Sequence, residues 1–547
     1  MSGEAGPRRN LLLPDVARFP ETEPVITLRG VTKRFRGKVV LQDLDLEIAT
    51  GQTTVIVGES GSGKSVLLRL MNGLTLPDAG EVRLFGEDLA RISERQRTEL
   101  RKRCTMVFQN YALIDSMTVF ENIAFPVKNN SRMPLADVAK LVDDLLVMLG
   151  LPDAREVLPA SLSGGMKKRV ALARAVITNP EVVLFDEPTT GLDPLMIEFV
   201  DNLIVQTRQA YAITSVIVSH DMASNRRLAD RMAMLSGGRI VATGTFDEVR
   251  ANPLPEVQAF LGNIVTDRMG RGDAPPEGTS GPIPEIVSTG GAMPTPVAGA
   301  LAPVVEVRGL HKSFGDNHVL KGIDLDIPAR KITVVIGGSG SGKSVLIKHI
   351  TGLLMPDEGT LKVFGQDLTK LDGDALIAVR ARIGMLFQGA ALFDSLTVAE
   401  NIGFPLVERR GGQSRKAVRG QVEAVAERLK VPHLLERFPS EISNGERKRV
   451  GLARAIITQP EIMIYDEPTT GQDPVMMRRV DDMIVEAAEQ FPITSIVISH
   501  DMLSTFRIAD RIAMVYQGDL VAVGTPDEVR ASKDPRVQAF IFAGAPE

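Results

Sequence analysis

Residues 58–65 read Gly58-Glu59-Ser60-Gly61-Ser62-Gly63-Lys64-Ser65, which is the pattern G-x-x-x-x-G-K-S. Residues 337–344 repeat this pattern as Gly337-Gly338-Ser339-Gly340-Ser341-Gly342-Lys343-Ser344. Each copy follows a short apolar run and precedes a helical pattern, which is the context in which the motif is meaningful. The glycines let backbone N–H groups close around a phosphate, while the helix N-terminus and the lysine add positive charge. Two copies in the same register predict two sites for nucleotide phosphates.

The length and composition of the chain favour two soluble domains. A chain of 547 residues is too long for one hydrophobic core, and 44% hydrophobic with 24% charged residues is ordinary for globular proteins. The net charge of −5 gives no reason to expect a nucleic-acid partner. The single cysteine, Cys104, excludes an internal disulfide. No stretch approaches the roughly 18 apolar residues of a membrane span, so we expect a cytoplasmic chain that reaches a membrane only through another protein.

The repeat covers both halves of the chain. Gln109 matches Gln388 at an offset of 279, and later pairs match at an offset of 280, so one residue is inserted between them. The segment between the halves is rich in Pro, Gly, Ala, Ser and Thr, which predicts a flexible linker. We predict a disordered leader at residues 1–22, a first domain at residues 23–263, this linker at residues 264–303 and a second domain at residues 304–547.

The buried strands are short apolar runs that alternate with helical segments. Examples are Val182–Phe185, Ser215–Val218, Ile462–Tyr465 and Ser495–Ile498. This alternation predicts an α/β fold with a largely parallel sheet in each half. In such sheets phosphate-binding loops sit at the carboxyl ends of the strands.

An Asp-Glu pair ends one of these apolar strands in each half. Asp186-Glu187 and Asp466-Glu467 each precede Pro-Thr-Thr-Gly. The aspartate is placed to hold Mg²⁺ beside a phosphate-loop serine hydroxyl, and the glutamate to polarise an attacking water. The predicted metal-site residues are Ser65, Gln109, Asp186, Ser344, Gln388 and Asp466.

Histidines and phenylalanines recur at matched positions. His220 and His500 close the next strand in each half, where we predict a contact with the terminal phosphate, although a lone histidine there is usually structural. Phe35 and Phe314 lie near the start of each half. Each ring is predicted to stack on adenine, with a core phenylalanine as the alternative.

A serine and two glycines precede a helical segment in the first half. Ser163-Gly164-Gly165 there predicts a second anion-binding helix end. A helix cap alone would explain the serine, but it explains the glycine pair less well.

Taken together, these motifs resemble the ATP-binding cassette (ABC) family over essentially both halves. The resemblance implies tandem P-loop NTPase domains, each with a mostly parallel sheet core, an antiparallel β subdomain and a helical signature subdomain. It also implies ATP and Mg²⁺ as cofactors, with Glu187, His220, Glu467 and His500 as catalytic residues. In this family two cassettes pair head to tail, so each phosphate loop should face the opposite signature. Lys64 should then face Ser443, and Lys343 should face Ser163.

The second signature departs from the family pattern. It reads Ser443-Asn444-Gly445, with asparagine where glycine is usual, followed by Glu446. We hypothesise that the site built from Lys64 and Ser443 turns over more slowly than the other. The alternative is that Asn444 is accommodated without effect, since asparagine tolerates unusual backbone angles.

A narrower resemblance lies in the segments after the two glutamines. Residues 112–119 and 391–398 read ALIDSMTV and ALFDSLTV, and each half then has a Phe-Pro pair. This pattern is similar to the ATPase subunit of MCE-associated (Mla-type) phospholipid transporters. It implies integral-membrane permease subunits and an MCE-domain lipid-binding protein as partners. ATPases of amino-acid or other small-solute importers are the alternative, and a soluble translation or repair factor is a third class.

Two further points stay open at this level. The segments 247–263 and 527–547 either contact the opposite cassette, as in similar transporter ATPases, or form plain terminal helices. Cargo, direction of transport, permease identity, the number of chains per transporter and the relative activity of the two sites cannot be predicted from the sequence.

Overall fold

The computed structural model describes residues 19–262 and 302–543, apart from residues 36, 110, 132 and 409–411. Residues 1–18 of the predicted leader and nearly all of the predicted linker therefore lie outside the described residues. Phe19, which we assigned to the leader, donates its N–H to Glu181 Oε2 at 2.7 Å, and its ring contacts Phe85 edge-on. The exact domain limits remain a prediction.

Two sheets build the first domain. An antiparallel sheet has the order β2-β1-β4-β5, and a six-stranded sheet has the order β10-β9-β3-β8-β7-β6. All neighbours in the larger sheet pair in parallel except β9 with β10. The strands are β1 (Pro24–Phe35), β2 (Lys38–Ala49), β3 (Thr53–Val57), β4 (Ala79–Leu84), β5 (Glu87–Asp88), β6 (Cys104–Val107), β7 (Val182–Asp186), β8 (Thr214–Val218), β9 (Arg231–Ser236) and β10 (Arg239–Gly244).

The larger sheet is buried on both faces, as its continuous apolar strands predict. Alternate residues of one strand enter different cores: Val55 and Val183 pack on one face, while Ile56 and Leu184 pack on the other. The covering helices are α1 (Lys64–Met71), α2 (Glu94–Arg103), α3 (Val119–Asn130), α4 (Leu135–Met148), η1 (Pro152–Ala154), η2 (Pro159–Ser161), α5 (Gly164–Val176), α6 (Pro194–Tyr211), α7 (Met222–Leu228), α8 (Phe246–Ala251), α9 (Pro255–Val257) and η3 (Gln258–Gly262).

The second domain repeats this arrangement, with sheets β12-β11-β14-β15 and β16-β17-β18-β13-β19-β20. Its strands are β11 (Pro303–Phe314), β12 (Asn317–Pro328), β13 (Ile332–Ile336), β14 (Glu358–Val363), β15 (Gln366–Asp367), β16 (Ile383–Leu386), β17 (Ile462–Asp466), β18 (Thr494–Ile498), β19 (Arg511–Tyr516) and β20 (Asp519–Gly524). Its helices are α11 (Lys343–Ile350), η4 (Leu368–Lys370), α12 (Gly373–Arg380), α13 (Val398–Val407), α14 (Arg415–Arg428), η5 (Pro432–Leu434), η6 (Pro439–Glu441), α15 (Asn444–Ile456), α16 (Pro474–Gln490), α17 (Met502–Ile508), α18 (Pro526–Arg530) and α19 (Pro535–Ala543). The predicted α/β fold is confirmed in both halves.

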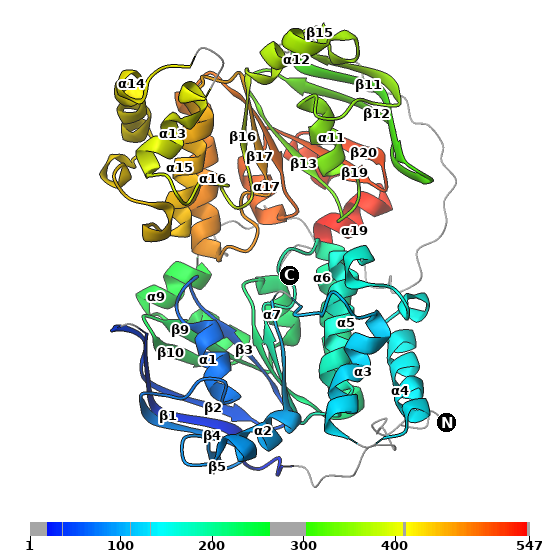
Figure 1. Ribbon diagram of the computed structural model, residues 1–547, viewed down its shortest axis with the longest axis vertical. Helices are drawn as coiled ribbons and strands as arrows, with labels where there is room; N and C mark the ends of the chain where they lie inside the picture. The colour runs from blue at the N-terminus through cyan, green and yellow to red at the C-terminus, as the bar shows by residue number, and fades with distance from the viewer. Residues whose placement is uncertain are drawn as a thin grey trace.

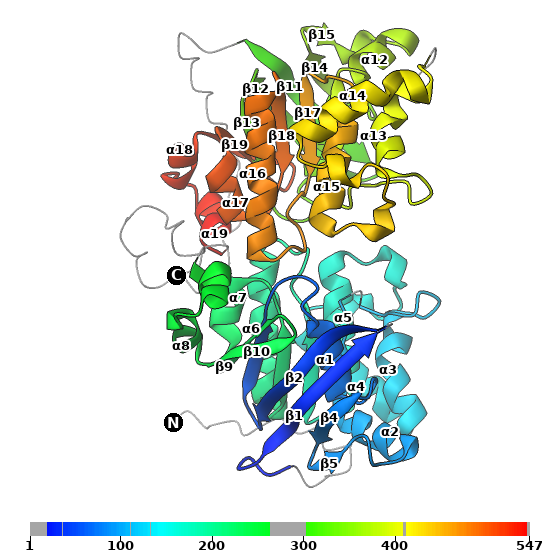
Figure 2. The same ribbon diagram turned by 90° about the vertical axis from the view of Figure 1, so that its left-hand side faces the viewer.

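The two domains stack with opposite orientations (Figures 1 and 2). In Figure 1 the helices α3 and α4 lie on the right of the lower domain, whereas α13 and α14 lie on the left of the upper domain. The C-terminal helix α19 contacts α6 of the first domain, and η3 contacts α16 of the second. Phe260 and Phe540 in these terminal segments are fully buried. The terminal segments therefore contact the opposite domain, which the sequence had left open.

Candidate nucleotide-binding and hydrolysis sites

The two phosphate loops have a backbone that only glycine permits at key positions. Gly58 has φ +151° and Gly63 has φ +107°, both in the region that favours glycine. A Cβ atom on Gly58 would lie 2.1 Å from the carbonyl oxygen of Leu235, and Gly337 is equally confined by Val515. The loop is thus a tight cradle between strand β3 and helix α1, which is the kind of backbone that binds an anion.

Polar groups inside the loops fit a phosphate. Lys64 is buried, and its Nζ donates to the carbonyl oxygens of Gly58 and Glu59, each at 2.8 Å. Burial lowers the pKa of Lys64, partly offset by nearby carboxylates. The hydroxyls of Ser62 and Ser341 are buried without a hydrogen-bond partner in the described part of the chain. A buried hydroxyl without a partner is costly, and a phosphate oxygen would satisfy each one.

The predicted Mg²⁺ residues lie beside the first loop. Ser65 Oγ donates to Asp186 Oδ1 at 3.1 Å. Burial raises the pKa of Asp186, so a cation there would favour its charged form. No group of three His, Cys, Asp or Glu side chains gathers as a preformed metal site in the described residues. The oxygens of Ser65 and Asp186 fit an ion that phosphate and water also coordinate, which is how Mg²⁺ is usually held.

The glutamates predicted to be catalytic lie beside the predicted histidines. His220 Nε2 lies 2.9 Å from Glu187 Oε1, and His500 Nδ1 lies 3.5 Å from Glu467 Oε1. Burial works to raise the pKa of Glu187, but the hydrogen bond and charge of His220 outweigh it and leave this pKa below its ordinary value. The pKa of Glu467 is lowered in the same way. An ionised carboxylate held beside a phosphate loop can orient and polarise a water.

Of the two predicted glutamines, Gln109 has a hydrogen bond to the neighbouring Asp-Glu pair in the described part of the chain. Gln109 Nε2 donates to Glu187 Oε2 at 3.1 Å, so in this conformation the amide contacts the catalytic carboxylate. Gln388 follows β16 at the matching position of the second domain. Their role as metal ligands stays a prediction.

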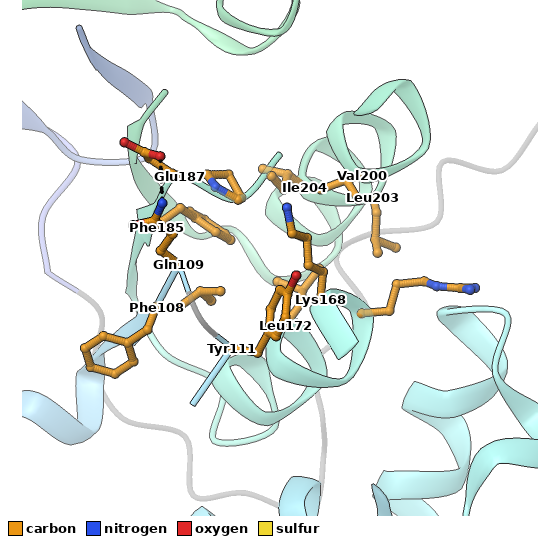
Figure 3. A pocket seen from close by; sticks show the side chains of 13 residues that line it. Phe108, Gln109, Tyr111, Lys168, Leu172, Phe185, Glu187, Val200, Leu203 and Ile204 are labelled. Atoms are coloured by element: carbon orange, nitrogen blue, oxygen red, sulfur yellow. Dashed lines mark hydrogen bonds between the residues drawn. The ribbon is translucent and has the colours of Figure 1, made fainter. Parts of the chain in front are cut away.

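A narrow hollow lies behind Gln109 (Figure 3). It is lined by the glutamine segment, the signature helix α5 and helix α6, and Figure 3 shows Tyr111 and Lys168 side by side within it while Phe108 points away. Lys168 Nζ donates to the carbonyl oxygen of Thr190 at 2.6 Å, and burial lowers the pKa of this lysine to about 7. The hollow therefore lies between the end of strand β7, at Phe185 and Glu187, and the signature helix α5.

An arginine from α5 holds the glutamine segment in a strained turn. Tyr111 and Ala112 have φ +61° and +48°, which non-glycine residues rarely adopt. Arg174 donates to the carbonyl oxygens of both residues, at 2.7 and 2.6 Å. Arg454 does the same for the matching turn in the second domain. Helix α5 and this turn are therefore held together in the first domain, as α15 and the matching turn are in the second.

Each phosphate loop is bonded to an aspartate of the other domain. Asp193 Oδ2 accepts from the N–H of Ser339, and Asp473 Oδ2 accepts from the N–H of Ser60, both at 2.8 Å. Both aspartates are buried. The aspartates also cap helices α6 and α16 through their other oxygen. We had not assigned these residues to the site, although an aspartate directly before a proline and a helical pattern is a recognisable cap signal.

The signature serines stand at helix N-termini, as expected. Ser163 and Ser443 cap α5 and α15 and accept from the N–H of Met166 and Glu446. Among the described contacts, neither serine is hydrogen-bonded to the opposite phosphate loop. Their contact with nucleotide stays a prediction.

The two phenylalanines are not core residues. Phe35 is 46% exposed and Phe314 is 49% exposed, each with a lysine ammonium over its ring. This exposure removes the core alternative, while stacking on adenine stays a prediction.

Comparison with known families decides the assignment. The sequence model of the ABC transporter family matches residues 41–190 and 320–470, which include both phosphate loops and both Asp-Glu pairs. The chain belongs to the ABC transporter family. It is an ABC ATPase with two cassettes, a family whose cassettes bind ATP with Mg²⁺.

Two of the similar proteins match nearly the whole length of this chain, and a third matches less than half of it. The putative ABC transporter ATP-binding protein VPA1482 of Vibrio parahaemolyticus is 30% identical, covering 92% of this chain and 89% of its own. The glutathione import ATP-binding protein GsiA of Salmonella choleraesuis is 28% identical, covering 92% and 86%. The methionine import ATP-binding protein MetN 3 of Pectobacterium atrosepticum is 38% identical over 43% of this chain and 70% of its own.

None of the helices described for this ABC ATPase has the length and apolar character needed to cross a bilayer. The predicted ATPase activity and cofactors are confirmed at the level of the family. The resemblance to MCE-associated ATPases is not decided by these comparisons and is taken up below.

Proposed function

We propose that this ABC ATPase powers an MCE-associated phospholipid transporter. The observation that carries the proposal is the pair of segments at residues 112–119 and 391–398, which are similar to those of that transporter group. Each segment follows the glutamine turn and leads into α3 or α13. Phe393 is 43% exposed and stacks on Phe404, and Phe125 is 40% exposed. Exposed aromatic side chains beside a mobile catalytic element suit a permease contact.

The two composite sites define the proposed cycle. ATP at Lys64 is sandwiched against the signature at Ser443, and ATP at Lys343 against the signature at Ser163. Glu187 and Glu467 polarise the attacking waters, and Ser65 and Ser344 would hold Mg²⁺, which would offset the negative charge of the phosphates. ATP binding closes the two cassettes and hydrolysis releases them, and the permease converts this motion into lipid movement.

The proposed assembly places the chain on the cytoplasmic face of a membrane. The permease subunits and an MCE-domain lipid-binding protein would supply the membrane-spanning and lipid-carrying parts. One chain per transporter is the simplest stoichiometry, because the two cassettes already pair within the chain. No nucleic-acid partner is proposed, since the net charge is −5.

Import of a small solute is the second candidate. It is favoured by the names of GsiA and MetN 3, which are described as glutathione and methionine import proteins. Such a transporter would deliver solute from a soluble binding protein instead of lipid from an MCE protein.

Purification of the tagged chain from its own membranes in mild detergent separates the candidates. Recovery of a permease, an MCE-domain protein and bound phospholipid, identified by mass spectrometry, is expected. A permease with a soluble solute-binding protein would replace the lipid proposal with the second candidate. Ribosomal proteins without any membrane partner would contradict both.

A further inference from the structure

The two signature helices begin with different hydrogen bonds. In the second cassette both the N–H and the hydroxyl of Ser443 donate to Glu446 Oε2, each at 2.8 Å. The matching residue in the first cassette is Met166, whose side chain offers no comparable acceptor to Ser163. The hydroxyl of Ser443 is therefore already used as a donor, whereas the hydroxyl of Ser163 accepts from the N–H of Met166 and finds no acceptor on the Met166 side chain.

The acceptor at Ser443 is charged. The N–H of Ser443, together with its hydroxyl and the charges around it, lowers the pKa of Glu446 below its ordinary value. His433 Nε2 lies 3.9 Å from Glu446 Oε1, on the carboxylate oxygen that does not face the serine. At neutral pH the acceptor of the hydrogen bond from the Ser443 hydroxyl is thus a negatively charged carboxylate. A phosphate approaching this hydroxyl would meet a like charge.

Asn444 of the second signature explains a difference in turnover between the two sites less well than Glu446 does. A Cβ atom on Gly164 would lie 3.7 Å from Tyr111 Oη, an ordinary van der Waals distance, so this position of the signature accepts a side chain. The second cassette has the smaller Ala390 where the first has Tyr111. Asn444 therefore needs no clash to be accommodated, and Glu446 is the difference that places a charge beside the signature serine.

Building on the head-to-tail pairing proposed above, we propose that Glu446 makes the site at Lys64 the slower of the two. Its carboxylate engages the Ser443 hydroxyl that would otherwise donate to the terminal phosphate, and it places a negative charge beside that phosphate. The site at Lys343, which faces Ser163, carries most of the ATP turnover. Glu446 is a positioning residue that acts through Ser443.

Exchange of the two residues tests this proposal in the full-length chain. Glu446→Met should raise the steady-state rate by at most about twofold, since it adds a second fast site. Met166→Glu should lower the total rate about fivefold, because both sites are then slow and each slow site runs about tenfold below the fast one, a difference that a hydrogen bond to a charged group accounts for. The double exchange should restore the wild-type rate, since it only swaps the fast and slow sites. If Glu446 and Met166 had only structural roles, the double exchange would instead lower the rate by the combined effect of the two single exchanges.

The catalytic glutamates identify which site has changed. In a Glu467→Gln chain, which leaves only the site at Lys64, Glu446→Gln should raise kcat about tenfold with the KM for ATP changed less than twofold. Glu446→Gln keeps an oxygen for both the N–H and the hydroxyl of Ser443 and removes only the negative charge, so it tests the repulsion of the terminal phosphate while the helix cap and the melting temperature are retained. Glu528→Gln is the matched control, because Glu528 forms the same type of cap with Thr525 at the start of α18.

The possible failures are distinguishable. If Glu187→Gln and Glu467→Gln each leave the rate unchanged, the assignment of the sites is wrong and this inference falls with it. If both lower the rate but the double exchange does not restore it, the pairing stands and the role of Glu446 is refuted.

Discussion

Replacement of Asp193 by serine tests the contact that joins the two cassettes. Asp193 is 4% exposed; its Oδ1 accepts from the N–H of Met196 at 3.1 Å, and its Oδ2 accepts from the N–H of Ser339 at 2.8 Å. Serine is as good a helix cap as aspartate, so the bond to Met196 should be replaced. The shorter side chain cannot reach Ser339, and the second bond is lost.

The size of the effect follows from that single bond. A hydrogen bond to a charged group contributes about 1.5–3 kcal/mol, and each 1.36 kcal/mol is tenfold in rate. We therefore expect Asp193→Ser to lower kcat/KM at the Lys343 site by about ten- to a hundredfold, and the total rate by up to about tenfold because the slower site at Lys64 still works. The rate is measured by phosphate release over a range of ATP concentrations.

Stability measurements separate the interface from the fold. Because the cap is kept, the melting temperature should fall by no more than about 4 °C. Asp473→Ser removes the equivalent bond to Ser60 and should have a smaller effect on the total rate, since it acts on the slower site. A rate within twofold of wild type for Asp193→Ser, with the melting temperature unchanged, would refute the importance of this contact.

Three further predictions concern the sites and the core. Glu187→Gln and Glu467→Gln should each lower ATP turnover without loss of ATP binding, and the larger loss should come from Glu467→Gln; equal losses measured by phosphate release would argue against unequal sites. Gly58→Ala should reduce the nucleotide bound per chain from two molecules to one in a fluorescent-nucleotide titration, because its Cβ would lie 2.1 Å from a carbonyl oxygen. Gly51→Ala should leave both sites, because no atom lies within 4 Å of its Cβ, and should cost about 1–2 kcal/mol of stability for the backbone strain at φ +75°. Burial raises the pKa of Asp481 to about 7, so the protonated form is favoured in the folded state, and this contribution is complete near pH 4 and lost as the pH rises through 7. Asp481→Asn should therefore increase stability at pH 8 by about 2 kcal/mol and have little effect near pH 4, as measured by urea unfolding; the same gain at both pH values would exclude this explanation.

Much of each cassette could be predicted because its determinants are local. The strand–loop–helix context of Lys64, the apolar strand before Asp186 and the strand before His220 all lie within short stretches of sequence. The structure brings these residues to one edge of the sheet, as the order of parallel strands requires. The α/β fold of both halves followed from the same local patterns.

The remaining features depend on how distant segments meet. Asp193 and Ser339 are 146 positions apart, and no local pattern shows that they contact each other. The contacts of α19 with α6 and of η3 with α16 likewise require knowing which domain face lies opposite. The Ser443–Glu446 box is local and has the recognisable form of a capping box, but its effect on the site depends on the pairing of the cassettes.

The bonds that cross between the cassettes also bear on how the chain is made. The first cassette leaves the ribosome well before the second, and domains generally fold as units in that order. Until residues 443 and 473 have been synthesised and docked, the loop at Lys64 lacks both its opposite signature and its opposite aspartate. A nascent or truncated chain should therefore bind nucleotide without hydrolysing it at an appreciable rate, and ATP consumption should begin only after translation is complete.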